Sequence, residues 1–210
     1  MNKLSSQDRS ALIRLASSLP AGDENRKAIL AGLSKTSAGE VNVPGQHIFQ
    51  KARVYDNAKV SGNAKVSGSA EVYDNATVYG TAQVSGNASV YGYAGASGNV
   101  KVDGTAAVYG KAWVSMNATV SGSAKVYEDA AVGGHAEVSG NAAVSGRASV
   151  AYNAKVSGNA KVYGKAVVGG NAMISGNAQI GGTAVILGGN WDGSEGPITS
   201  GTWSAPGVPA

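Results

Sequence analysis

Small and branched hydrophobic residues recur with a strict six-residue period between Ala52 and Leu187, separated by polar residues and glycine. Alanine fills 22 of the 23 positions spaced six apart from Ala52 to Ala184, and Val or Ile stands two places later everywhere except at Ala96. Residues two apart on a strand point to the same side, and the Gly-Asn pairs that follow readily turn the chain. Each hexapeptide is therefore predicted to be a short strand and a corner, stacked on its neighbours.

The repeat resembles that of the hexapeptide-repeat proteins, whose pattern is an aliphatic residue, a small residue, two free positions, a small residue and a free position. Residues 60–65, which read VSGNAK, follow this pattern, with the difference that Ser or Tyr usually takes the second position. The resemblance implies an all-β solenoid: a left-handed parallel β-helix with triangular coils of 18 residues, three hexapeptides to a coil.

The residue that follows valine supports the 18-residue coil independently, because positions 18 apart would then share one column of a face. One such column contains six tyrosines: Tyr55, Tyr73, Tyr91, Tyr109, Tyr127 and Tyr163. Ser145 interrupts this column and Gly181 ends it. We expect these rings to stack about 4.8 Å apart in offset geometry. An exposed tyrosine stripe is also suited to binding a carbohydrate or a protein partner.

A second face of the predicted solenoid has no charged residue in its outward positions after Lys59. Interface cores are depleted in charge and enriched in aromatic residues. We therefore expect a homotrimer that associates along this face, which the family resemblance also implies. The predicted interface residues are Thr77, Tyr79, Trp113, Ser115, Ala131, Ser149, Val167, Val185 and Leu187.

Residues 1–35 are predicted to form a helical hairpin, because their apolar residues recur at helical spacing. A hairpin of this size is not stable alone, so it either caps the first coil or docks the chain onto a larger assembly. The candidate docking residues are Leu12, Leu15, Leu19, Ile29, Leu30 and Leu33.

The repeat itself, residues 52–187, is flanked by two further segments. Residues 36–51 are expected to be a linker whose Ile48 and Phe49 plug the first coil. Residues 188–210 are expected to be an extended tail that covers the last coil or a neighbouring subunit, because Trp191 and Trp203 are too large for a plain disordered segment.

The chain has no cysteine, so disulfides and thiolate sites are excluded. No apolar run has the length of a signal peptide or a membrane span, so we expect a soluble protein made in the cytosol, with no membrane partner. The net charge is +4, and the ten Lys and Arg of the repeat are interspersed with seven Asp and Glu. Nucleic acid is not an expected partner, because nucleic-acid binding normally needs a basic stripe.

Many relatives that share the hexapeptide repeat are acyltransferases that use a histidine at a cleft between subunits. The histidines here are His47, before the first coil, and His135, at a corner, and no loop projects from the repeat. Asp192 and Glu195 alone do not make a cation loop. We therefore predict no catalytic residue, cofactor or metal, and keep an acyltransferase-like enzyme as an alternative.

A non-catalytic structural protein is the function that we predict. The repeat and the leader DRSALIRLASSLPAGDENRKAILAGL resemble those of proteins often found in phages and prophages. This resemblance implies a virion accessory subunit, such as a capsid decoration or a fibre-like protein, attached through the hairpin. An adhesin that binds carbohydrate or protein through the tyrosine stripe is the second alternative.

Overall fold

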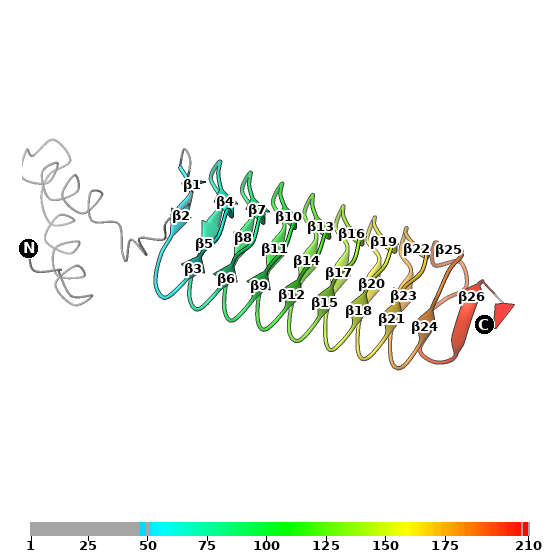
Figure 1. Cartoon of the computed structure of the whole chain (residues 1–210). Helices are drawn as coiled ribbons and strands as arrows, with labels where there is room; N and C mark the ends of the chain where they lie inside the picture. The colour runs from blue at the N-terminus through cyan, green and yellow to red at the C-terminus, as the bar shows by residue number, and fades with distance from the viewer. Residues whose placement is uncertain (1–46, 49–50, 207, 210) are drawn as a thin grey trace, which may run out of the picture. The chain divides into compact units, whose positions relative to one another are not determined.

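The described part of the chain forms an all-β parallel solenoid of about eight coils in a computed structural model (Figure 1). The structure describes residues 47–48, 51–206 and 208–209, and it contains no helix in these ranges. It confirms the predicted parallel β-solenoid. The predicted hairpin at residues 1–35, the linker up to residue 46 and Phe49 of the predicted plug lie outside the described residues.

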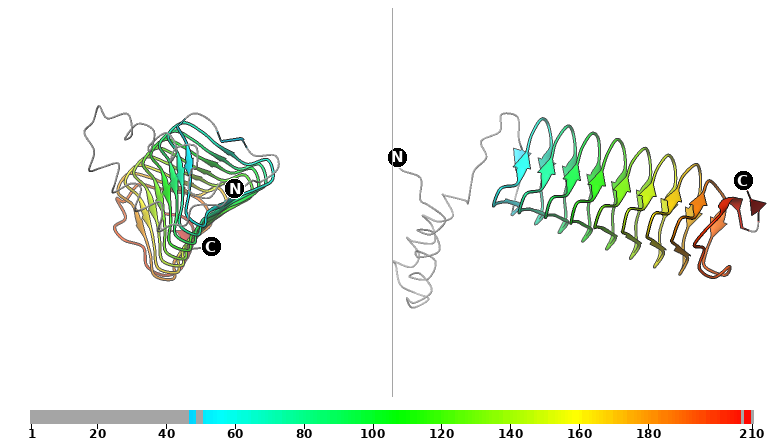
Figure 2. Two further views of the ribbon diagram at one scale, coloured as in Figure 1. Left: turned by 90° about the vertical axis from the view of Figure 1, so that its left-hand side faces the viewer. Right: turned by 90° about the horizontal axis from the view of Figure 1, so that it is seen from below.

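Short strands stack into three sheets, and successive strands along the chain belong to different sheets (Figure 2). Sheet A contains β1 (His47–Ile48), β4 (Lys65–Val66), β7 (Gln83–Val84), β10 (Lys101–Val102), β13 (Thr119–Val120), β16 (Glu137–Val138), β19 (Lys155–Val156), β22 (Met173–Ile174) and β25 (Asn190–Trp191). Sheet B contains β2 (Arg53–Val54), β5 (Glu71–Val72), β8 (Ser89–Val90), β11 (Ala107–Val108), β14 (Lys125–Val126), β17 (Ala143–Val144), β20 (Lys161–Val162) and β23 (Gln179–Ile180).

Sheet C contains β3 (Lys59–Val60), β6 (Thr77–Val78), β9 (Gly95–Ala96), β12 (Trp113–Val114), β15 (Ala131–Val132), β18 (Ser149–Val150), β21 (Val167–Val168), β24 (Val185–Ile186), β26 (Thr202–Ala205) and β27 (Val208–Pro209). Within the repeat, each strand pairs in parallel with the strand 18 residues further on, as in the pairing of Lys101 with Thr119. Every face of the solenoid therefore presents columns of residues 18 positions apart.

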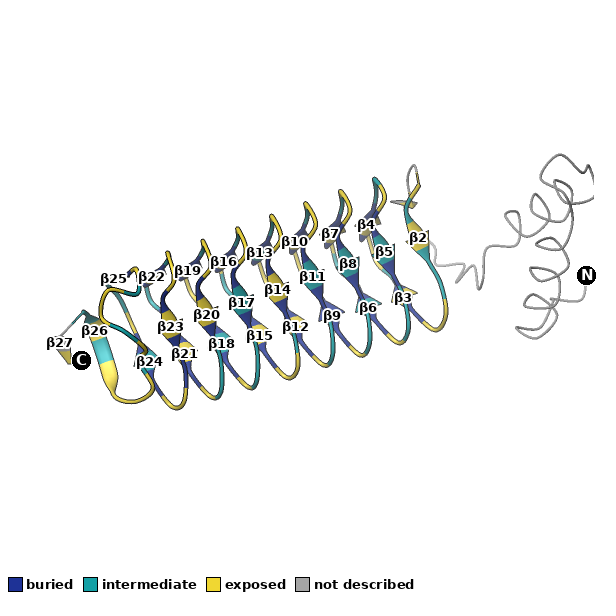
Figure 3. Ribbon diagram, turned by 180° about the vertical axis from the view of Figure 1, so that it is seen from behind, coloured by how far each residue is buried: buried dark blue, intermediate teal, exposed yellow. Residues whose placement is uncertain are grey.

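The core consists of the alternating Ala and Val or Ile positions, which are 0 to 1% exposed from Ala58 to Ile186 (Figure 3). Alanine keeps the interior narrow, while each buried valine contributes about 1.5 to 3 kcal/mol of hydrophobic stabilisation. Most corners hold a glycine with a positive φ, such as Gly68 at 71°. A Cβ at Gly68 would lie 2.7 Å from the carbonyl oxygen of Gly86 in the next coil, so the corner is crowded as well as left-handed.

The C-terminal segment continues the sheets. β25 pairs with β22 and β26 pairs with β24, but the register shortens to 17 residues, as in the pairing of Val185 with Thr202. Trp191 is buried and meets Trp203 edge to face at 6.4 Å between ring centroids. Both indole N–H groups donate to backbone carbonyls, that of Trp191 to Gly188 and that of Trp203 to Ser200. These two rings close the end of the apolar core.

Candidate functional surfaces

A ladder of stacked tyrosines runs along the outer face of sheet B. Tyr55, Tyr73, Tyr91, Tyr109 and Tyr127 have neighbouring ring centroids 4.8 to 5.1 Å apart and interplanar angles of 2 to 5°. All five rings are half-buried. The structure thus brings together five of the six tyrosines that the sequence places in this column, because the coil repeat matches the spacing at which offset rings attract one another.

The environment of the ladder favours the neutral phenol. Burial, and then the nearby carboxylate of Glu71, raise the pKa of Tyr55 to about 12. The hydroxyl of Tyr55 donates to Oε2 of Glu71 at 3.4 Å, and Glu71 is paired with Arg53 at 3.6 Å. Burial also raises the pKa values of the next three rings, Tyr73, Tyr91 and Tyr109.

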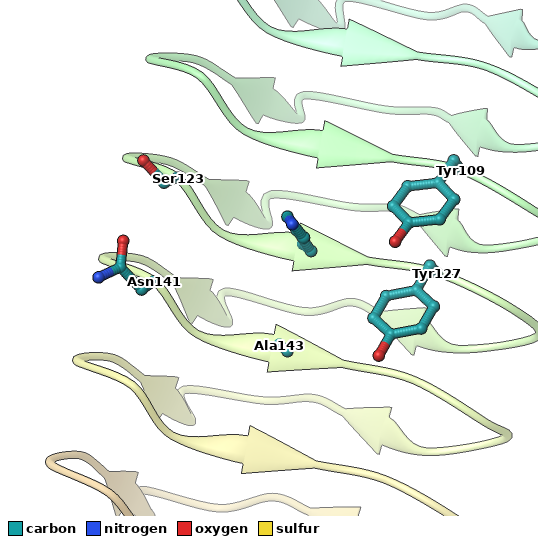
Figure 4. Close-up of a pocket in the computed structure, with 6 residues that line it drawn as sticks. Tyr109, Ser123, Tyr127, Asn141 and Ala143 are labelled. Carbon is teal, nitrogen blue, oxygen red and sulfur yellow. The ribbon is translucent and has the colours of Figure 1, made fainter.

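The ladder ends at Tyr127. Ser145 occupies the next place in the column, and the ring of Tyr163 beyond it lies over Gly181, where a Cβ would overlap the ring. In the described part of the chain, Tyr127 therefore stacks on Tyr109 alone, and no aromatic ring lies on its other face. Beside the last rings lies an open depression of about 490 Å³, lined by Tyr109, Ser123, Lys125, Tyr127, Asn141 and Ala143 (Figure 4).

The outer face of sheet C is flat and uncharged after Lys59. All nine predicted interface residues lie on this face, and all are exposed or half-exposed. The indole of Trp113 lies over Gly95, where a Cβ would overlap it, and its ring centroid is 6.0 Å from that of Tyr79, two coils away. Gly95 and Ser97 are consequently buried, although Trp113 itself remains 39% exposed.

The corner between sheets C and A adds two exposed apolar residues, Met116 and Tyr152, which are 63% and 70% exposed. Both occupy the corner position that is usually glycine, with φ of 63° and 60°. The ring of Tyr152 reaches back over sheet C, since its Cδ2 lies 3.4 Å from where a Cβ of Gly169 would be. Sequence reasoning missed both residues, although a large apolar side chain at a glycine position was a readable signal.

Three acidic residues with positive φ, at the corner between sheets B and C, provide a contrast. Carboxylates of Asp56, Asp74 and Glu128 each accept a hydrogen bond from a backbone N–H in the next coil, at 3.4, 3.1 and 2.6 Å. Such bonds compensate for the left-handed backbone. Met116 and Tyr152 make no comparable hydrogen bond within the described residues, so no such bond compensates for their backbone strain inside the protomer.

The ranges that the structure describes show no arrangement of side chains typical of a catalytic or metal-binding site. His135 is exposed at a corner, where its backbone N–H donates to the carbonyl of Tyr152. Asp192 accepts from the backbone N–H of Ser194 at 2.9 Å, which lowers the pKa of the carboxyl, and Glu195 adds no third ligand. The described residues contain neither a group of three metal-ligating side chains nor a helix long and apolar enough to cross a membrane.

These features define a β-solenoid protein whose recognisable surfaces are the tyrosine ladder on sheet B and the uncharged face of sheet C. A family model described as "YdcK Beta solenoid repeat" matches residues 154–170, which span β19, β20 and β21. The chain is thus similar to that family over about one coil. No curated protein and no solved structure matches the chain.

Proposed function

We propose that this chain is a non-catalytic structural protein: a rigid rod that assembles into a homotrimer along the outer face of sheet C. One observation carries the proposal. Of the nine large hydrophobic residues exposed among the described residues, six lie on sheet C or at its uncharged corner with sheet A: Tyr79, Trp113, Met116, Tyr152, Val167 and Leu187. Exposed apolar residues concentrated on one uncharged face are typical of a protein interface.

The corner between sheets C and A favours a cyclic assembly. Its residues carry no Asp, Glu, Lys or Arg from Gly62 to Asn171, so the uncharged surface continues from the sheet around this edge. A ring of three subunits uses a different patch on each side of every contact. The face of one protomer can then meet the edge that holds Met116 and Tyr152 in the next. Burial in such a contact would offset the strain of their left-handed backbone.

The proposal includes finer features of the fold and the larger assembly. Coils of triangular section, as in the hexapeptide-repeat proteins, are supported by the three sheets and the 18-residue register. The left hand of the coil is supported by the resemblance to those proteins alone. The resemblance to phage and prophage proteins supports a role as a virion accessory subunit attached through residues 1–35. Removal of residues 1–40 separates the two roles of that segment: loss of folding would favour a cap, and an intact solenoid that no longer attaches to its assembly would favour docking.

A charge placed on sheet C tests the interface. Trp113→Lys should weaken self-association by about tenfold or more, because a lysine would be desolvated at the centre of the contact. Val167→Lys should act in the same way, and it leaves the packing of Trp113 on Gly95 intact. The matched control is Met173→Lys on sheet A, which replaces a side chain that is 47% exposed at the same repeat position. Equal association of all three variants and the wild type, by sedimentation equilibrium, would refute the proposal.

A further inference from the structure

We propose that the break in the tyrosine ladder at Ser145 is a binding site for an acidic saccharide, in which a pyranose ring stacks on the face of Tyr127 that no other aromatic ring of the described chain covers. The site lies on sheet B and is independent of the proposed assembly along sheet C. It would allow the solenoid to bind a uronic-acid polymer while its other face holds the subunits together.

The stacking partner is already in place. Tyr127 is held at 5.1 Å and 5° from Tyr109, at the end of four successive stacked pairs, so its orientation is fixed before a ligand arrives. Small residues, Ala143 and Ser145, occupy the coil that follows, and Ser145 stands where the column pattern would otherwise place a sixth ring. The missing ring leaves a place where one flat ligand ring can continue the stack. A preorganised site of this kind reduces the ordering cost of binding.

The lining of the depression suits a sugar. Ser123 and Asn141 border the depression at the corner between sheets A and B (Figure 4). There the Ser123 hydroxyl lies 2.9 Å from that of Thr105, and the Asn141 amide N–H donates to Oδ1 of Asn159 at 3.2 Å. The hydrogen-bonding capacity that remains on the Ser123 hydroxyl and the Asn141 amide suits the hydroxyl groups at the edge of a pyranose. The face of a tyrosine ring is electronegative, so it attracts the C–H groups on the flat side of a sugar.

The charges beside the break select a carboxylate. Lys125 and Lys161 flank Ala143 in the same column of sheet B, since each of them is the register partner of Ala143 in an adjacent strand. Neither lysine makes an ion pair within the described ranges. The acidic residues nearest in sequence, Glu128 and Asp129, lie beyond the tyrosines at the corner between sheets B and C, where the Glu128 carboxylate is held by a 2.6 Å hydrogen bond from the N–H of Gly146, next to Ser145. The side of the ring that faces Ala143 is therefore cationic and suited to a uronate.

The experiment is a titration of the full-length chain with trigalacturonate and with triglucuronate, followed by calorimetry and saturation-transfer NMR. Saturable binding of at least one of them is expected, with a dissociation constant on the order of millimolar because the site is open. The methyl ester of the same sugar, which lacks the charge, should bind about tenfold more weakly. Lys125→Gln should remove that difference between acid and ester.

The decisive variant is Ser145→Tyr, which supplies the missing ring. It should fold, because tyrosine occupies the equivalent position in six other coils, and it should weaken saccharide binding by about tenfold or more. The matched control is Ser139→Tyr, which adds a tyrosine at the same repeat position on sheet A and should bind like the wild type. The proposal is wrong if neither sugar binds saturably, if Ser145→Tyr binds as well as the control, or if only a neutral aromatic probe such as N-acetyltyrosinamide binds. Since Ser145→Tyr does not touch sheet C, its outcome is independent of the oligomeric state.

Discussion

Replacing Met116 by glycine should make the isolated protomer more stable and the assembly weaker. Met116 holds φ at 63°, is 63% exposed and makes no hydrogen bond that compensates for this backbone in the described part of the chain. Glycine is the residue found at the same place in most other coils, for instance at Gly98 and Gly134. The substitution thus removes strain and removes an apolar contact that we assign to the next protomer.

The expected magnitude follows from two opposing terms. A left-handed backbone destabilises an L-residue by about 1 to 2 kcal/mol, and glycine relieves this strain. The greater conformational freedom of glycine in the unfolded chain offsets about 0.5 to 1 kcal/mol of the resulting stabilisation. The side chain of Met116 is mostly exposed, so little packing is lost within the protomer. Met116→Gly should therefore raise the free energy of unfolding of the monomer by about 0.5 to 1 kcal/mol.

Two measurements on one variant check this reasoning. Denaturant unfolding at a concentration low enough for the monomer should show the gain in stability, while sedimentation equilibrium at higher concentration should show weaker association. The reverse control is Gly134→Ala, in which the new Cβ would lie 2.7 Å from the backbone nitrogen of Tyr152; it should destabilise the monomer by about 1 kcal/mol or more. A monomer destabilised by Met116→Gly, or association unchanged by it, would contradict the account.

Three further predictions concern the solenoid itself. Val114→Ala, at a position that is 0% exposed, should lower the free energy of unfolding by about 2 kcal/mol, and an effect near zero would contradict a packed interior. Trp191→Ala should cost about 3 to 5 kcal/mol and increase hydrogen exchange first in the last coils, because the ring closes the core there; uniform loss of protection would argue against this role. Because the folded pKa of Tyr55 is raised to about 12 from 10.0, its contribution to stability should be complete below pH 10.0 and disappear as the pH rises towards 12. In an ultraviolet titration, Tyr55→Phe should remove the phenol that ionises at the highest pH. Ionisation of every tyrosine near pH 10.0 would refute the stacked, half-buried ladder.

The repeat could be predicted from the sequence because its period encodes the fold. Alanine and valine two places apart require a strand, and the glycine corners require a turn, so local pattern and global stacking give the same answer. The tyrosine column that begins at Tyr55 is the clearest case. Its 18-residue spacing specified which rings would meet, and the structure stacks the first five of them.

Other features could not be predicted, because they depend on rotamers and on departures from the repeat. Ser145 separates Tyr163 from the ladder, as the sequence already indicates, but the sequence does not show that the Tyr163 ring lies over Gly181 in the next coil. The pattern alone also does not show that Trp113 covers Gly95. The tail after Leu187 has no period, so its addition of β25 and β26 to two sheets follows from tertiary packing of Trp191 and Trp203.

The central claim, a rod that trimerises along sheet C, is tested most directly by the native mass of the full-length protein. Sedimentation equilibrium over a wide range of concentrations should give three times the chain mass of 20.8 kDa, with dissociation only on dilution. A mass of 20.8 kDa at every concentration would contradict the account, because the apolar residues of sheet C and its corners would then remain exposed to water without a second copy of the chain to cover them.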